Sequence, residues 1–374
     1  MKILYFSKDY TPHDHRFLSL LAQTDHEVHF LRLESRKPSS EERPIPENVS
    51  VIPWNGKLSS SNFLGLLQRR RELGEILQTL KPDLVHAGPV QKGAFLTACV
   101  GFSPLLSMSW GSDILLDARR GWGRWIAGYT LKRSTLFLCD CETVAQAAYE
   151  LGMLEERTFI FPWGVDLDHF SPDGVSEIRK KLNWEHQIVF LSARSMEEIY
   201  GVEIIAEAFV DLVRKNQNVR MLFLGDGSLR EKIERRLHRA GLREYVHFAG
   251  HVSYEKLPEY YRAVDVYVSA SHVDGSSISL LEALACGRPA LVSDIPGNLE
   301  WVTYGLNGWT FSVGSSQALA AQMAEAIEDL KFFPSFSAQS RQVAEERANW
   351  RLNSKKLLEA YRVAYQLSRG ISHA

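Results

Sequence analysis

The hydrophobic positions of this chain come in short runs of β-branched and aromatic residues, separated by longer stretches with helical spacing. Such runs are typical of buried parallel strands, and the stretches between them are typical of the helices that connect these strands. In Asn62–Leu80, for example, leucine and isoleucine recur on one face of a helix. The strands expected in the first half are Lys2–Ser7, Glu27–Leu33, Val49–Trp54, Asp83–Ala87, Leu105–Trp110, Thr135–Cys139 and Thr158–Pro162.

The alternation starts again after a turn-rich segment, PWGVDLDHFSPDG, at residues 162–174. We therefore predict two doubly wound α/β domains, residues 1–170 and 171–348, followed by a last helical segment, 349–374. Strands of the second series are expected at Gln187–Arg194, Arg220–Gly225, Val246–Gly250, Asp265–Ser269 and Ala290–Ser293. Its helices are expected at Val202–Lys215, Leu229–Ala240, Lys256–Ala263 and Ser279–Ala285.

Composition narrows the class of protein. The 374 residues are 45% apolar and 24% charged, the balance of a soluble globular chain. Because the chain has 43 basic and 45 acidic residues, no positive excess points to a nucleic-acid partner.

The uncharged stretch Gly93–Ser112 contains Gly101 and Pro104, so a buried helix followed by a strand explains it better than a membrane span. Four cysteines without a CxxC pair and no signal peptide lead us to expect reduced thiols and a cytoplasmic protein.

One segment of the second half has the pattern of a phosphate-binding loop. A small, polar loop, Asp274–Ser277, follows an apolar run, and a helix opens near Ser279 with Glu282 in its first turn. Backbone N–H groups at such a helix start favour a phosphate, and Glu282 can accept hydroxyls from a ribose. The spacing alone leaves an alternative open, in which Ser279 caps the helix and Glu282 completes a capping box.

The same segment resembles the signature of the retaining family-4 glycosyltransferases. Their motif has two acidic residues separated by seven positions and then A-x-A-x-G-x-P; here Asp274 and Glu282 are followed by ALACGRP. Nearly the whole chain shares the resemblance. Further matching segments are FPWGVD at 161–166, LFLGDG at 222–227, FAGHV at 248–252 and NW at 349–350.

The resemblance implies the GT-B fold, an α/β architecture of two Rossmann-like domains facing across a cleft, with the C-terminal helix packing back on the N-terminal domain. It implies transfer of a sugar, with retention of configuration, from a nucleotide diphosphate sugar to a hydroxyl of a glycan, a lipid-linked acceptor or a small molecule. No cofactor and no essential metal are expected. Two alternatives stay open: a nucleotide-sugar epimerase on the same fold, and a non-catalytic protein that binds nucleotides or sugars.

The family's functional residues carry over onto matching positions of this chain. Arg194 would bind the diphosphate, Asp274 would lie near the donor sugar, and Asp113 would belong to the catalytic set in the first domain. Glu282 would bind the ribose. The other donor-binding positions implied by the resemblance are Ser276, Ser277, Ile278, Tyr200, His251 and Val252.

The chain also departs from the family pattern. Tyr200 stands where the family has a lysine, Trp110 stands where it has a histidine, and the glycine-rich loop after the first strand is replaced by SKDYTPHDHRF. We expect the acceptor or sugar side to be formed by residues of that loop and of later strand ends, namely His13, His15, Arg16, His86 and Trp110. A solvated polar loop and a structural histidine at position 86 are the alternatives.

The segment Arg119–Arg133 has five basic residues, two tryptophans and no acidic residue. Such a pattern is typical of a helix that docks on an anionic membrane. The alternative, which the sequence favours, is an ordinary surface helix with Trp125 and Ile126 in the core.

Overall fold

The computed structural model describes residues 1–34, 39–54 and 63–369, so the start of the predicted helix at Asn62 lies outside the described residues. The chain forms two compact units, Met1–Phe161 with Ser354–Ala374, and Pro162–Asn353. The first unit ends before residue 170, the predicted boundary, because the chain after Phe161 already pairs within the second unit: Val165 N donates to Ala348 O at 2.7 Å.

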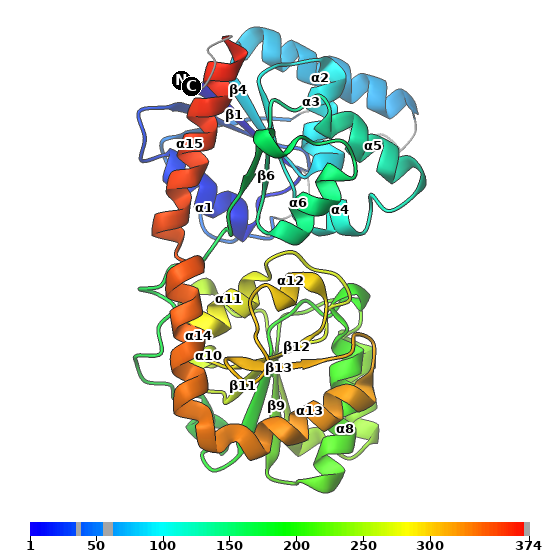
Figure 1. Ribbon diagram of the computed structural model, residues 1–374, viewed down its shortest axis with the longest axis vertical. Helices are drawn as coiled ribbons and strands as arrows, with labels where there is room; N and C mark the ends of the chain where they lie inside the picture. Colours follow the sequence, from blue (N-terminus) through cyan, green and yellow to red (C-terminus); the bar gives the residue numbers. More distant parts are fainter. Residues whose placement is uncertain (35–38, 55–62, 370–374) are drawn as a thin grey trace. The chain divides into compact units, whose positions relative to one another are not determined.

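The first unit is built on a seven-stranded parallel sheet with the order β3-β2-β1-β4-β5-β6-β7 (Figure 1). Its strands are β1 Lys2–Ser7, β2 Glu27–Arg32, β3 Val49–Ile52, β4 Leu84–Gly88, β5 Leu105–Met108, β6 Leu136–Cys139 and β7 Thr158–Ile160. Its helices are α1 Pro12–Leu21, α2 Phe63–Leu80, η1 Val90–Ala94, α3 Phe95–Val100, α4 Ser112–Leu115, α5 Gly121–Leu131, α6 Glu142–Tyr149 and η2 Glu155–Arg157. The last helix, α15 Trp350–Ser368, belongs to this unit from Ser354 on.

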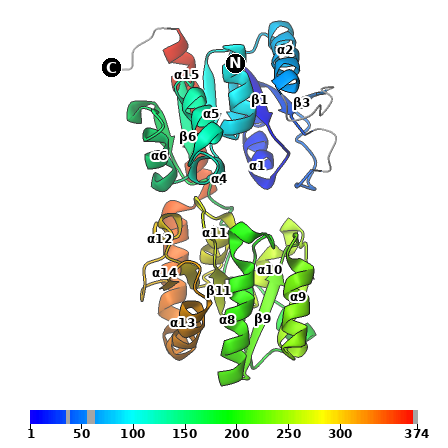
Figure 2. The ribbon, with the colours of Figure 1, turned by 90° about the vertical axis from the view of Figure 1, so that its right-hand side faces the viewer.

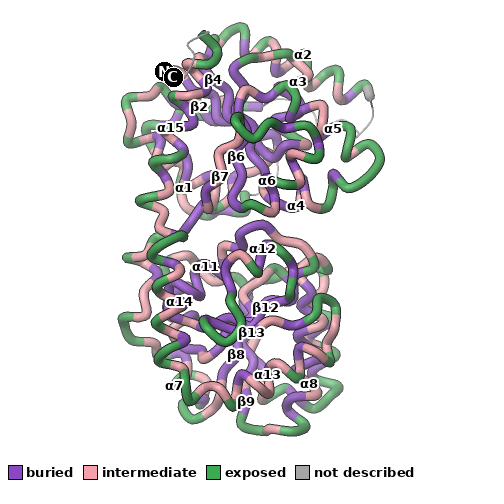
Figure 3. Tube along the Cα trace, viewed as in Figure 1, coloured by how far each residue is buried: buried purple, intermediate pink, exposed green. Residues whose placement is uncertain are grey.

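Alternate side chains of the first sheet enter different cores. Leu4 and Phe6 of β1 pack with Leu73 of α2 and Leu96 of α3. Tyr5, which points to the other face, makes edge contacts with Phe17 of α1. Helices therefore cover both faces, as expected for a parallel sheet, and the strands run through the buried centre of the unit in Figure 3.

The second unit has a six-stranded parallel sheet with the order β10-β9-β8-β11-β12-β13. Its strands are β8 Ile188–Ser192, β9 Val219–Leu224, β10 Val246–Gly250, β11 Val266–Ser269, β12 Ala290–Ser293 and β13 Gly308–Phe311. The helices are α7 Ile178–Leu182, η3 Glu198–Tyr200, α8 Val202–Lys215, α9 Arg230–Arg239, η4 Arg243–Tyr245, η5 Tyr254–Lys256, α10 Leu257–Arg262, α11 Ile278–Ala285, α12 Pro296–Leu299, α13 Ser316–Asp329, η6 Leu330–Phe332 and α14 Phe333–Arg347.

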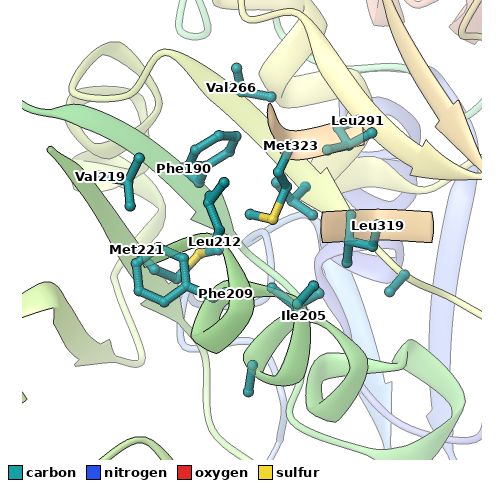
Figure 4. Close-up of a cluster of buried hydrophobic side chains, with 14 of the residues drawn as sticks. Phe190, Ile205, Phe209, Leu212, Val219, Met221, Val266, Leu291, Leu319 and Met323 are labelled. Carbon is teal, nitrogen blue, oxygen red and sulfur yellow. The ribbon is translucent and has the colours of Figure 1, made fainter. Parts of the chain in front are cut away.

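Two cores hold the second sheet between its helices. One contains Phe209 of α8 and Met323 of α13, packed on Phe190 and Met221 of the strands (Figure 4). The other is formed by α10, α11 and α14 on the opposite face, as Figure 2 also indicates. The C-terminal edge of this sheet is thereby held rigidly from both sides, and the loops that follow the strands start from fixed points.

The structure confirms the predicted alternation and corrects several elements. The SKDYTPHDHRF segment is not an extended loop, because α1 begins at Pro12, capped by a reciprocal pair of hydrogen bonds between Thr11 and Asp14. The strand predicted to reach Trp110 ends at Met108. The expectation for Gly93–Ser112 is confirmed as helix and strand, and none of the described helices is long and apolar enough to cross a membrane.

Candidate donor-binding site

The strand order of the second unit defines where a ligand can bind. From β8 the chain continues to β9 and β10 on one side and returns to β11, β12 and β13 on the other. The connections therefore leave β8 and β11 in opposite directions, which opens a crevice at their carboxyl ends, the usual ligand position in such sheets. Arg194 follows β8, and the loop 270–277 follows β11.

Arg194 is the centre of the contacts at this edge. Its Nη2 donates to Asp274 Oδ2 at 2.6 Å, and its Nη1 donates to Ser277 Oγ at 2.5 Å. The guanidinium carbon lies 4.1 Å from the centre of the Tyr200 ring. The structure thus brings together four predicted donor-side residues, and Tyr200, which replaces the family's lysine, stacks on the arginine.

The Arg194–Asp274 pair is nearly enclosed. The two side chains are 11% and 17% exposed. Burial raises the pKa of Asp274 above its usual range, although Arg194 and the backbone of Gly275 act against that rise. Burial is the largest influence on the pKa of Arg194 and works to lower it, but Asp274 and the three tyrosines Tyr267, Tyr200 and Tyr261 together raise the pKa above its usual value. Arg194 is therefore a permanent cation at this edge of the sheet.

Hydroxyl groups extend this network into the sheet. Ser277 Oγ lies 3.2 Å from Ser279 Oγ, which in turn lies 2.7 Å from the Tyr267 hydroxyl of β11. Trp301 Nε1 donates to Ser276 Oγ at 3.1 Å and holds the other serine of the loop. Sequence reasoning missed Ser279, Tyr267 and Trp301 as supports of the site, because no local pattern links them to the loop.

Glu282 lies in α11 and is buried. The helix begins at Ile278 with Ser277 at its N-cap, and no side chain caps it. The capping-box alternative for Ser279 and Glu282 is therefore wrong. Glu282 Oε2 instead accepts from the Tyr261 hydroxyl of α10 at 2.7 Å, a partner that the sequence did not indicate.

His251 and Val252 follow β10, the strand at the outer edge of the sheet. His251 is exposed, whereas Val252 packs against the core that α10 and α11 share. Both belong to the same unit as Arg194 and Glu282.

Asp113 of the first unit has a clear structural role. Its carboxylate accepts from Val90 N at 2.8 Å, from Ser109 Oγ at 2.7 Å and from Trp110 N at 2.9 Å. Burial raises the pKa of Asp113 to about 6, against these hydrogen bonds. Asp113 thus fixes the turn that carries Trp110. Among the described residues, Trp110 Nε1 is buried without an acceptor.

His86 does not line an open site. It is 1% exposed, and its Nδ1 lies 2.6 Å from the Tyr361 hydroxyl of α15. Its ring also packs edge-on against Tyr5. Burial lowers the pKa of His86 to about 3, so the ring is neutral at physiological pH. The structural alternative for this histidine is the one that the geometry favours.

His13, His15 and Arg16 lie in α1 rather than in a loop, which corrects their predicted setting. All three are partly buried. His15 Nδ1 lies 2.7 Å from the Tyr10 hydroxyl. Burial, and secondarily the charge of Arg16, lowers the pKa of His13 to about 3. No cluster of three or more metal-binding side chains is found among the described residues.

The prediction that Trp125 lies in the core is wrong. Trp125 is 54% exposed and Trp122 is 78% exposed, because the buried face of α5 is formed by Ala127, Thr130 and Leu131. Ile126 is partly buried.

The fold and the loop at the β8–β11 edge are those of a nucleotide-binding protein made of two Rossmann-like units. Comparison with known protein families identifies the class of protein. The family model "Glycosyl transferases group 1" matches residues 175–351, and the family model "Glycosyl transferase 4-like" matches residues 2–141. The chain belongs to the group 1 glycosyltransferases, family 4, with the GT-B fold.

Individual relatives are distant. The chain is 24% identical over 210 residues to the GDP-mannose-dependent alpha-(1-6)-phosphatidylinositol monomannoside mannosyltransferase of Mycobacterium tuberculosis, with 54% of each chain covered. It is 25% identical over 167 residues to the alpha-monoglucosyldiacylglycerol synthase of Streptococcus pneumoniae, covering 42% of this chain and 37% of the relative. The chain spans about half the length of the curated relatives it matches.

A solved structure matches over the full chain. HepE of Anabaena in complex with UDP-glucose has a TM-score of 0.76 and 20% identity, and the match covers 99% of this chain and 100% of that one. This likeness establishes the fold.

Proposed function

We propose that the protein transfers a sugar, with retention of configuration, from a nucleotide diphosphate sugar to an acceptor hydroxyl. The observation that carries the proposal is the position of Arg194, a nearly enclosed cation beside the N-terminal end of α11. The relative from Mycobacterium tuberculosis is named for a GDP-sugar donor, which supports the donor class.

The leaving group of this reaction is a nucleoside diphosphate, so negative charge grows on its phosphate oxygens as the glycosidic bond breaks. A fixed guanidinium and the backbone amides of Ser276, Ser277 and Ile278 would stabilise that charge. Glu282 would bind the ribose, and His251 and Val252 would lie beside the base. Asp274, which binds Arg194 in the free site, would be released towards the donor sugar when the diphosphate binds.

Transfer assays with two variants test these roles. Glu282→Ala is expected to lose donor binding, whereas Arg194→Ala is expected to lower turnover. Product analysis by NMR, with and without acceptor, separates transfer from the epimerase alternative, because an epimerase converts the donor alone. Full activity in both variants would overturn the site assignment.

We also propose that the acceptor is lipid-linked and that α5 meets an anionic membrane surface. Trp122 and Trp125 are exposed and contact each other edge-on, with ring centres 5.8 Å apart. A cavity of about 390 Å³ beside them is lined by Arg124, Lys132 and Arg133 among others, with Glu150 as its acidic residue. Exposed tryptophans beside cations suit the interface of an anionic bilayer. The two relatives compared above, from Mycobacterium tuberculosis and Streptococcus pneumoniae, are named for phosphatidylinositol and diacylglycerol lipids.

The free cysteines suit a reducing, cytoplasmic setting.

Vesicle co-sedimentation tests the membrane contact. The wild type is expected to bind phosphatidylglycerol vesicles at low salt, and Trp122→Ala/Trp125→Ala is expected to lose most of that binding. Phe332→Ala removes a comparably exposed aromatic residue beside Lys331 in the other unit and serves as the matched control. Equal binding by the tryptophan variant, or no binding by the wild type, would contradict the contact.

A further inference from the structure

The short segment that carries Tyr200 is anchored to its surroundings. Met196 N donates to Asp226 O at 2.9 Å, and Leu229 N donates back to Met196 O at 2.9 Å. The Glu197 carboxylate accepts from Ser228 N at 2.8 Å. The backbone leading to Tyr200 is therefore tied to the segment that follows β9, and the position of the tyrosine is set before any ligand binds.

The segment is also tied to the loop that carries Asp274. His272 N donates to Ile199 O at 2.9 Å. Gly201, directly after Tyr200, has a φ of 60°, and a Cβ there would lie 2.2 Å from Ala270 O. The two loops thus touch backbone to backbone, so Tyr200 and Asp274 hold a fixed relation across Arg194.

Arg194 is held in two different ways. Asp274 and Ser277 bind the edge of its guanidinium through hydrogen bonds, whereas the Tyr200 ring lies 4.1 Å from the guanidinium carbon. Among the described residues, Arg194 Nε is buried without an acceptor. An anion that displaces Asp274 removes the charged contact at the edge but leaves the ring contact in place, because the ring attracts the cation independently of the carboxylate.

We propose that Tyr200 is a positioning residue, which keeps the plane of the Arg194 guanidinium fixed while Arg194 passes from Asp274 to the diphosphate of the donor. The inference rests on the proposed function, which assigns Arg194 to that diphosphate. The Tyr200 ring carries no charge of its own, so it orients the charge of Arg194 and adds none. Tyr200 contributes through its ring and not through its hydroxyl.

Three variants test the proposal. Tyr200→Phe keeps the ring and is expected to retain turnover within about twofold of the wild type. Tyr200→Leu removes the ring and is expected to lower turnover about tenfold, with a smaller change in KM, because a misplaced cation acts mainly in the transition state. Tyr245→Leu is the matched control, since Tyr245 stacks on Arg220 at 4.7 Å in the same unit. Thermal unfolding checks that each variant is folded.

Equal turnover in Tyr200→Leu and the wild type would overturn the proposal. An equal loss in Tyr200→Phe and Tyr200→Leu would also overturn it, because the hydroxyl would then be the active group. Nucleotide binding by each variant is measured with whichever of UDP, GDP, ADP or dTDP stabilises the wild type against thermal unfolding.

A second measurement separates this proposal from the proposed function. The aromatic ring shifts the NMR signal of the Arg194 Nε–H in the free protein, so Tyr200→Leu is expected to move that signal and Tyr200→Phe to leave it in place. An unmoved signal overturns the stacking whether or not a nucleotide binds. If the signal moves but no nucleotide binds, the proposed function fails, and the positioning role fails with it.

Discussion

At the scale of single residues, Arg194 carries the most specific prediction. Arg194→Ala is expected to lower turnover by about 10²–10³-fold, the usual effect of removing one fixed donor from a developing anion. Arg220→Ala, which removes an arginine stacked on Tyr245 in the same unit, is the control and is expected to leave turnover unchanged. Steady-state release of the nucleoside diphosphate measures both. Unchanged turnover in Arg194→Ala would refute the role.

The sequence indicated which residues belong to the donor site but not how they contact one another. Arg194 and Asp274 are 80 positions apart, and only the adjacency of β8 and β11 brings them to 2.6 Å. The resemblance implied separate tasks for Asp274, Ser277 and Tyr200, whereas all three contact Arg194 in the free protein. Such convergence depends on strand order, which periodicity along the chain does not encode.

At the scale of elements, the turn between η3 and α8 makes a testable claim. Gly201→Ala is expected to destabilise the protein by more than about 2 kcal/mol, because the left-handed backbone and a contact with Ala270 O act together. Gly241→Ala has a similar φ of +76° with no neighbour within 4 Å of the added Cβ, so its cost is expected to be only about 1 kcal/mol. Urea unfolding measures both, and equal losses would contradict the account.

The contact between α15 and β4 predicts a pH dependence. Burial lowers the pKa of His86 to about 3, below the value near 6.5 of an unfolded chain. The unfolded state therefore binds the additional proton, and the contribution of neutral His86 is complete above pH 6.5 and is lost as the pH falls. The slope is about 1.4 kcal/mol per pH unit below 6.5.

Unfolding in urea between pH 7 and 4 tests this dependence. His86→Gln cannot titrate, so its deficit relative to the wild type is expected to shrink as the pH falls. Tyr361→Phe keeps the histidine and is expected to keep the slope. The other aromatic side chain against the His86 ring with a titratable group, Tyr5, has a pKa raised by burial and stays neutral throughout this range. Parallel curves for the wild type and His86→Gln would contradict the assignment.

Most of the strands could be predicted because apolar runs between polar segments are unambiguous when a sheet is covered on both faces. Several elements were not predicted, among them one strand and the first helix. The strand β13 has the sequence GWTF, in which Trp309 and Phe311 are separated by Thr310, so no continuous apolar run marks it. The helix α1 starts at Pro12, a residue that also marks turns, and only the hydrogen bonds between Thr11 and Asp14 distinguish the two.

At the scale of the whole molecule, the proposed donor-binding residues all lie in one of the two compact units, Pro162–Asn353. Hydrogen exchange with a bound nucleoside diphosphate is expected to show increased protection in residues 194–201 and 270–282 of the second unit, because the ligand replaces contacts of Arg194 and orders the start of α11. The turn held by Asp113 in the first unit is the internal reference. Protection gained there, and not around Arg194, would place the nucleotide elsewhere.

We propose above all that Arg194 and the start of α11 bind a nucleoside diphosphate. Thermal unfolding tests this directly, with UDP, GDP, ADP and dTDP, each in magnesium and in EDTA. At about a hundred times its dissociation constant, a ligand of the folded state adds roughly 2.7 kcal/mol. We expect stabilisation by one of these nucleotides, equal in magnesium and EDTA and lost in Glu282→Ala. No stabilisation by any of them, or the same stabilisation in Glu282→Ala, would contradict it.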